Sequence, residues 1–144
     1  MTDIPDASNL LVTAREVLLA DIVPGLPKGL RHAALMIANA MAIAAREHRD
    51  GADALRGETA RLRELLEATG SAAEPATIAA TAAAPASRAP VPADLDTLRR
   101  RLVEAIRGGA FDGPPHHAAL IEHLSRTSAD WTAISNPKAL RGTR

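Results

Sequence analysis

The chain has 144 residues, of which 47% are hydrophobic and only 1% aromatic, and its 17 basic residues balance 17 acidic ones. This length suits one domain of ordinary size, and aliphatic side chains must supply the core. A net charge of zero provides no field that would attract nucleic acid, so we expect no nucleic-acid partner. The absence of cysteine excludes a disulfide framework, a thiolate zinc site and a cysteine nucleophile.

The sequence shows no pattern typical of a secretory signal or of a membrane-spanning segment. The opening stretch MTDIPDASN is polar and acidic, without the basic and apolar regions of a secretory signal. The apolar run at residues 33–45 is too short to cross a bilayer, and charged side chains bracket it. We therefore expect a cytoplasmic protein without a membrane partner.

The first part of the chain predicts two helices joined by a turn. Residues 8–23 carry apolar side chains at spacings of three and four, with Ser8 or Asn9 as the N-cap. The segment PGLPKG cannot continue a helix and predicts a tight turn. Residues 30–48 are apolar on nearly every side, which is typical of a helix surrounded by neighbours, so we expect this second helix at the centre of the core.

A third helix and a linker follow. After the letters RDG, residues 52–68 place Leu55, Leu62, Leu65 and Leu66 on one face. Residues 71–93 are rich in alanine and proline and offer too little apolar area to offset the entropy of ordering, so they predict a flexible linker. The ordered parts are expected at about residues 8–68 and 94–138.

Two more helices are predicted after the linker. The stretch DLDTLRRRLVEAIRGG has a stripe made by Leu95, Leu98, Leu102, Ala105 and Ile106, and its paired glycines are a helix stop. From Pro115 to about Ser135 a fifth helix is expected, with a stripe through Leu120, Leu124, Ser128 and Trp131 and a stop at SNPK. The sequence thus predicts an all-α fold: a single domain over residues 1–144, formed by a five-helix bundle with a long Ala/Pro-rich linker between helices three and four.

Asn39 is the one carboxamide inside the apolar second helix. A buried amide without partners costs on the order of 1 to 3 kcal/mol, so it needs hydrogen bonds. One interpretation is structural, with the amide bonded to exposed carbonyls of the PGLPKG turn or of another helix end. The alternative is a polar contact in a pocket or at a subunit interface.

Histidines and arginines give weaker signals. His116 and His123 are two helical turns apart, too far to share one metal ion, and His117 does not repair this spacing, so solvated side chains are favoured. The basic run Arg99–Arg101 is able to grip a phosphate, but nearby acids favour a solvated helix face. Glu58, Glu64 and Glu67 are interpreted as ordinary surface acids.

Phe111 and Trp131 are the only large aromatic residues. Both are expected as core anchors, and for Trp131 a place at a partner interface is an equal alternative. The chain has no phosphate-binding glycine loop, dinucleotide fingerprint, nucleophile elbow or zincin helix. We therefore predict no catalytic, cofactor-binding or metal-binding residue, and no enzyme.

Four segments in order, LLVTAREVLLADIVPGL, IANAMAIAAREH, LRRRLVEAIRGGAFD and SNPK, carry a family resemblance. The chain resembles a bacterial family of small helical domains of unknown function, encoded beside aminoglycoside-phosphotransferase-like kinases and acyl-CoA dehydrogenases. The resemblance implies a non-catalytic companion subunit of such a kinase and a role in hydroxyacyl-CoA catabolism. Six residues of this chain match residues that recur in the family, and together with Trp131 they are candidates for shared structure or partner contact. They are Asn39, Arg107, Gly109, Asp112, Asn136 and Pro137.

Two other functions remain open on the residues alone. One is a stand-alone small-ligand or metal-binding helical protein that uses His116, His117, His123 or the run Arg99–Arg101. The other is a structural homo-oligomer in which the apolar second helix completes the core of a second copy.

Overall fold

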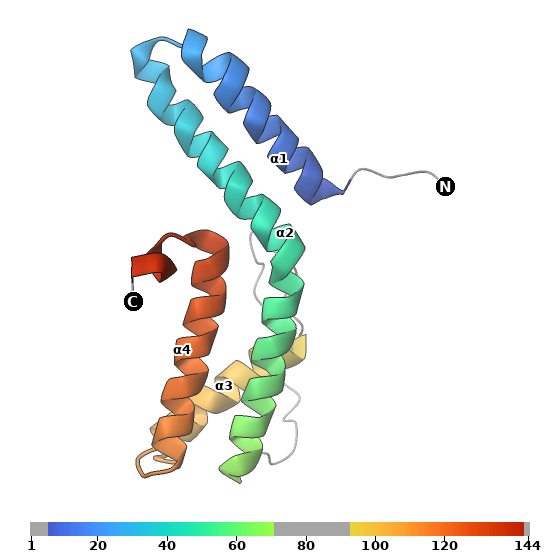
Figure 1. Ribbon diagram of the computed structural model, residues 1–144. Coiled ribbons are helices and arrows are strands. Elements are labelled where there is room, and N and C mark those ends of the chain that lie inside the picture. The colour runs from blue at the N-terminus through green and yellow to red at the C-terminus, as the bar shows by residue number, and fades with distance from the viewer. Residues whose placement is uncertain (1–5, 71–92, 143–144) are drawn as a thin grey trace, which may run out of the picture. The chain divides into compact units, whose positions relative to one another are not determined.

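The computed structural model describes residues 6–70 and 93–142, and no strand occurs among them. The elements are α1 (Ala7–Val17), a π-helical turn (Leu18–Ile22), a 3-10 turn (Val23–Gly25), α2 (Lys28–Ala68), α3 (Ala93–Arg107), α4 (His116–Ser135) and a 3-10 turn (Ala139–Gly142) (Figure 1). The all-α prediction is confirmed, but this part of the chain has four α-helices where the prediction, counted over the whole chain, had five. The linker predicted at 71–93 lies, apart from Ala93, outside the described residues.

The predicted second and third helices are one continuous helix, α2. The letters RDG were interpreted as a break, yet Gly51 lies within the helix and is buried. A glycine inside a helix costs only about 1 kcal/mol relative to alanine. The residues that follow it are strong helix formers without proline, so the helix passes through the glycine.

The contacts divide the chain into two compact units, each described here by itself. The first unit comprises Met1–Ala52 and Thr132–Arg144, and the second comprises Asp53–Trp131. The expectation of a single domain stays a prediction.

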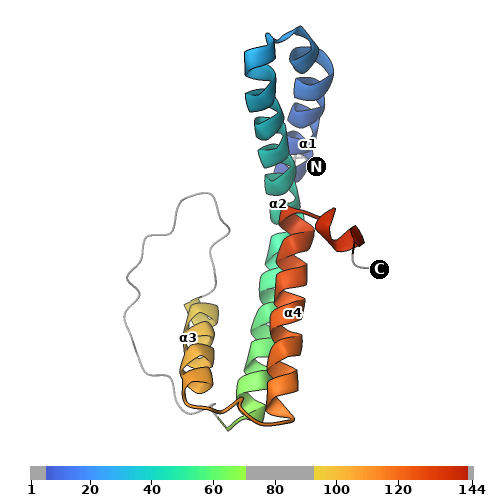
Figure 2. The ribbon, with the colours of Figure 1, turned by 90° about the vertical axis from the view of Figure 1, so that its left-hand side faces the viewer.

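In the first unit, α1 runs antiparallel along the first part of α2 (Figures 1 and 2). Small side chains on α2, Ala34, Ala38 and Ala45, are buried at this contact and allow close approach. The Ser8 hydroxyl donates to the Ala45 carbonyl at 3.1 Å, and Arg15 Nε donates to the Ala38 carbonyl at 3.1 Å. Ser8 is therefore a buried contact residue, and Asp6 takes the N-cap position that was predicted for Ser8 or Asn9.

The turn between α1 and α2 forms where PGLPKG predicts it, although α2 already begins at Lys28. Its carbonyl groups are bound by Arg31, which donates from Nε to Leu26 and from Nη2 to Pro24 at 3.0 and 3.1 Å. This is the role that one interpretation gave to Asn39. An arginine supplies it because its long fork reaches carbonyls one turn back along the chain.

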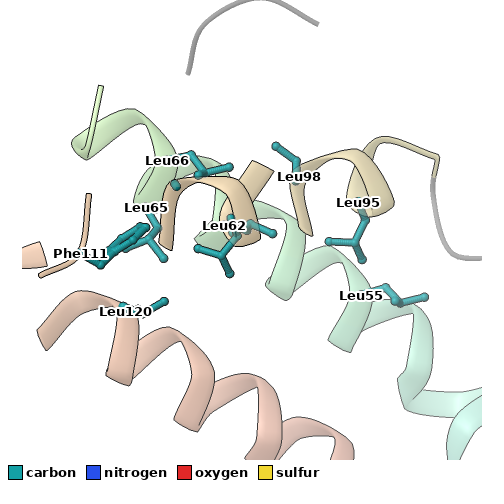
Figure 3. Packing of buried hydrophobic residues seen from close by; sticks show 10 residues of the cluster. Leu55, Leu62, Leu65, Leu66, Leu95, Leu98, Phe111 and Leu120 are labelled. Carbon is teal, nitrogen blue, oxygen red and sulfur yellow. The ribbon is translucent and has the colours of Figure 1, made fainter. Parts of the chain in front are cut away.

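The second unit contains the apolar core. Its buried members come from the second part of α2, from α3, from the following turn and from α4: Leu55, Leu62, Leu65, Leu66, Leu95, Leu98, Leu102, Ala105, Phe111 and Leu120. Figure 3 shows these side chains gathered in the space between the helices. The leucine stripes predicted for residues 52–68 and for α3 up to Ala105 are confirmed, whereas Ile106 is 40% exposed.

The prediction that residues 30–48 form the centre of the core is wrong. Leu30, Leu35, Met36 and Ile37 are each 50–56% exposed. An apolar surface all around a helix predicts burial only if neighbours exist to cover it. Within the described residues α1 covers one face of this segment, and Arg46 Nε donates to the Ile134 carbonyl at the end of α4, while the side chains of Leu30, Leu35, Met36 and Ile37 stay exposed.

Glycines end two of the helices. Gly70, with φ +68°, follows α2 and donates from its N–H to the Glu67 carbonyl. At the end of α3, Gly109 has φ +78° and donates to Ile106, and Ala110 donates to Ala105. These two bonds form a Schellman motif, so the predicted glycine stop is confirmed.

Candidate functional site

The exposed face of α2 in the first unit carries an unbroken apolar stripe. Its members are Leu30, Ala33, Ile37, Ala40 and Ala44, all exposed. The spacing of three and four residues alternates over four turns, which is the pattern of a coiled-coil seam. Three alanines among the five residues allow a partner helix to approach closely. We call this set the α2 stripe.

A second apolar set lies on α1 and consists of the exposed residues Leu10, Ala14 and Val17. It lies about 120–180° around α1 from Ser8, which contacts α2, so this set is on the side of α1 that faces away from α2. The α2 stripe is therefore a separate apolar surface.

Asn39 is exposed, which contradicts the expectation of a buried amide. It lies two residues after Ile37, about 200° around the helix, and therefore away from the α2 stripe. An exposed amide is satisfied by water, so the cost of burial does not arise. A contact between Asn39 and a partner stays a prediction.

The polar centre of the second unit is Glu58, whose side chain is 5% exposed. Arg99 on α3 donates from Nε and Nη2 to its two carboxylate oxygens, each at 2.7 Å. Trp131 on α4 donates to the same carboxylate. Burial raises the pKa of Glu58, but the hydrogen bonds and charge of Arg99, with Trp131 and His123, outweigh it and hold the pKa below its ordinary value.

His123 on α4 is 6% exposed. Burial lowers the pKa of His123 below its ordinary value; the Glu58 carboxylate opposes this shift and the Arg61 guanidinium adds to it. Its Nδ1 is buried without a hydrogen-bond partner among the described residues. A polar group in this state costs on the order of 1 to 3 kcal/mol.

Arg61 on α2, like His123, has a buried nitrogen without a hydrogen-bond partner among the described residues. Its Nη2 donates to Asp130 Oδ2 at 2.7 Å, while its Nε is buried and has no partner in the described part of the chain. Arg61 and His123 both line a cleft of about 330 Å³ between α2 and α4. Glu64, Glu122 and Arg126 also line it. Two nitrogen atoms without hydrogen-bond partners among the residues that the structure describes thus belong to residues that line this cleft, and exposed charged residues line it as well.

Three of the candidates taken from the resemblance lie together after α3. Arg107 is the last residue of α3 and is exposed. The Asp112 N–H donates to the Gly109 carbonyl at 3.2 Å, and Asp112 Oδ2 would lie 2.9 Å from a Cβ on Gly109. Gly109 and Asp112 thus shape one turn of the second unit.

The remaining candidates are at the end of α4. Asn136 donates from its N–H to Thr132 and accepts from Ala139, so it turns the chain where SNPK predicts a stop, with Pro137 next to it. Trp131 packs half-buried against the apolar core, as a core anchor does. Asn39, Asn136 and Pro137 belong to the first unit, and Arg107, Gly109, Asp112 and Trp131 belong to the second.

The basic run and the histidines divide between two roles. Arg99 is bound to Glu58, whereas Arg100 is exposed. His117 is exposed, and His116 is half-buried at the start of α4. Within residues 6–70 and 93–142, no group of three or more His, Cys, Asp or Glu side chains is placed to hold a metal ion. None of the helices described has the length and apolarity needed to cross a membrane.

Sequence reasoning assigned Glu58 and His123 to the solvated surface, and both are buried. The signal was available in the helical register. Glu58 continues the spacing of Leu55 and Leu62, and His123 follows Leu120 by three residues. The stripe predicted for α4 included Leu124 and not His123, because leucine is more apolar than histidine. In the structure Leu124 is 43% exposed.

Comparison with known proteins gives one family. Residues 24–139 match the family described as "Domain of unknown function (DUF6285)". No curated protein and no solved structure matches the chain significantly. The match covers most of the 144 residues and includes α2, α3 and α4. The chain therefore belongs to this family of domains of unknown function.

Proposed function

We propose that this protein is a non-catalytic companion subunit that binds another protein through the α2 stripe. The observation that carries the proposal is the α2 stripe, five exposed apolar residues at heptad spacing. Large exposed apolar surfaces on soluble domains mark interaction sites. The partner is expected to contribute an amphipathic helix that lies along the stripe.

The partner in this proposal is the one that the sequence resemblance implies, an aminoglycoside-phosphotransferase-like kinase encoded beside the companion. The pathway proposed with it is hydroxyacyl-CoA catabolism. The α2 stripe contains no charge, so the facing positions of the kinase helix are expected to be apolar as well, because an unpaired buried charge is costly.

The test is co-expression of the full chain with the neighbouring kinase, followed by co-purification and a kinase assay. Ile37→Glu places a charge in the middle of the α2 stripe. Ile121→Glu is the matched control, because Ile121 is 50% exposed and Ile37 is 52% exposed. We expect the wild type and Ile121→Glu to co-purify with the kinase and raise its activity, and Ile37→Glu to do neither.

Circular dichroism and melting of the purified variants check that both remain folded. If the wild type neither co-elutes with the kinase nor changes its rate, the companion function is wrong. If instead the pure protein is a dimer that only Ile37→Glu makes monomeric, the stripe serves a second copy of the chain and the homo-oligomer takes its place.

A further inference from the structure

The cleft of the second unit has the features of a small-ligand site, and none of its lining residues belongs to the α2 stripe. Its volume of about 330 Å³ is in the range of ligand pockets. Arg61 and His123 form its less exposed wall, and Leu65, Ala68 and Ala119 add apolar surface. An apolar floor beside a few convergent donors is the usual composition of such a site.

Two nitrogen atoms of this wall have hydrogen-bonding capacity to spare. Arg61 Nε and His123 Nδ1 are both buried and both lack a partner within the described residues. Being buried, they meet a ligand only after their side chains turn toward the cleft. Neither of these two nitrogens gives up a hydrogen bond of its own when it turns. The bond from Arg61 Nη2 to Asp130 Oδ2 has to be kept or exchanged for one to the ligand.

The acceptor that matches these donors is a carboxylate. Its two oxygens accept from a guanidinium and from an imidazole at once, and charge-assisted bonds of this kind are strong. The exposed Glu64 stands at the same cleft and disfavours ligands with two negative charges, such as phosphate. A single negative charge with an apolar tail fits both the donors and the floor.

We propose that the cleft binds a short aliphatic monocarboxylate, with the carboxylate between Arg61 and His123 and the chain over Leu65, Ala68 and Ala119. Glu64 and Glu122, the two acidic residues that line the cleft, remain at the edge of the bound group. The ligand enters a site formed by α2 and α4 only, so it requires no partner protein.

Binding takes up a proton. The charged groups around the His123 ring are Glu58, Arg61 and Glu64 on α2, Glu122, Arg126 and Asp130 on α4, and Arg99 on α3 behind Glu58. A carboxylate added to this set favours the imidazolium form of His123. The affinity is therefore expected to rise as the pH falls from 8 to 6.

The experiment is an NMR titration of the full chain, labelled with ¹⁵N, with sodium butyrate at pH 6.5. The imidazole ¹⁵N shifts of His123 report which ring nitrogens carry protons. We expect saturable shifts toward the imidazolium form with butyrate and none with sodium chloride, sodium phosphate or n-butylammonium chloride at the same ionic strength. No saturable shift, or equal shifts with chloride and phosphate, would overturn the proposal.

Arg61→Gln tests the head group of the site, and Arg56→Gln is its control. Arg56 lies on the same helix, is exposed and pairs with Asp53 outside the cleft. We expect the butyrate dissociation constant to rise at least tenfold in Arg61→Gln and to stay unchanged in Arg56→Gln. Equal binding by the two variants contradicts the assignment. The kinase experiment is independent, because it tests a surface of the first unit and its only variant in the second unit is the control Ile121→Glu.

Discussion

Arg99 on α3 and Glu58 on α2 form a two-point ion pair, in which both carboxylate oxygens of a nearly buried glutamate accept hydrogen bonds of 2.7 Å from one guanidinium. The Glu58 side chain is 5% exposed, while that of Arg99 is 34% exposed. The pair therefore ties two helices that are far apart in sequence. Arg99 stabilises the fold because it neutralises the Glu58 carboxylate, whose burial without a partner would be strongly destabilising.

Replacement of Arg99 by Met leaves the Glu58 carboxylate without its main partner. We expect a loss of about 2 to 4 kcal/mol in the free energy of unfolding, somewhat less than for a fully buried pair because water reaches Arg99. Urea denaturation at pH 7 measures the loss. Arg100→Met, on the exposed side of the same helix, is expected to change it by less than about 0.5 kcal/mol. Equal losses in both variants would refute a special role for the pair.

The lowered pKa of His123 makes the fold sensitive to mild acid. Between the ordinary histidine pKa of about 6.5 and the lower value in the folded state, the unfolded chain binds more protons, so the free energy of unfolding falls as the pH drops. Glu58 contributes at lower pH, since its stabilisation is lost only as the pH falls through its own lowered pKa.

Denaturation midpoints between pH 5 and 8 therefore separate the two groups. His123→Gln is expected to show a smaller decline in stability from pH 7 to pH 5 than the wild type. The comparison concerns the slope with pH, so a uniform change in stability of the variant does not affect it. Identical slopes would show that His123 is not the group responsible.

Gly109 is required by its backbone conformation and by its neighbour. Its φ of +78° disfavours any other residue, and a Cβ there would lie 2.9 Å from Asp112 Oδ2. Gly109→Ala is expected to destabilise the protein by about 1 to 3 kcal/mol in thermal or urea denaturation. Gly113→Ala is the control, because a Cβ at Gly113 meets no atom within 4 Å. A neutral Gly109→Ala variant would argue against the observed turn.

Ala38 and Asn39 are adjacent on α2 but face different surroundings. Ala38 is 2% exposed against α1, so Ala38→Leu overpacks the hairpin and is expected to cost about 1 to 3 kcal/mol. Asn39→Leu changes an exposed position and is expected to alter stability by less than about 0.5 kcal/mol. Melting temperatures of the two variants measure the contrast. A large loss in Asn39→Leu would mean that the amide is structurally bonded after all.

Local patterns predicted the helices well where the deciding interactions are local. The turn at PGLPKG, the paired glycines after α3 and the stop at SNPK are found where the residues indicate them. The break at Gly51 is absent, because a single glycine weighs little against the helix formers that follow. Helix propensity and helix capping depend on residues that are close in the sequence, so both can be predicted from the sequence.

The polar centre was not predicted. The helical spacing from Leu55 to Leu62 places Glu58 on the buried face of α2. A glutamate in an apolar stripe is predicted to be buried only if a basic partner for its carboxylate is known. That partner, Arg99, is 41 residues away in sequence. The cleft is likewise formed by side chains from α2 and α4, and nothing local links Arg61 to His123.

The sequence by itself determined the helical class, the leucine faces of α2 and α3, the turn before α2 and the ends of α3 and α4, because period and capping are properties of neighbouring residues. Only the tertiary structure decided which apolar surface is buried. It placed the core around the second part of α2 and left Leu30 and Ile37 exposed, since burial depends on which other helices are present to cover a face.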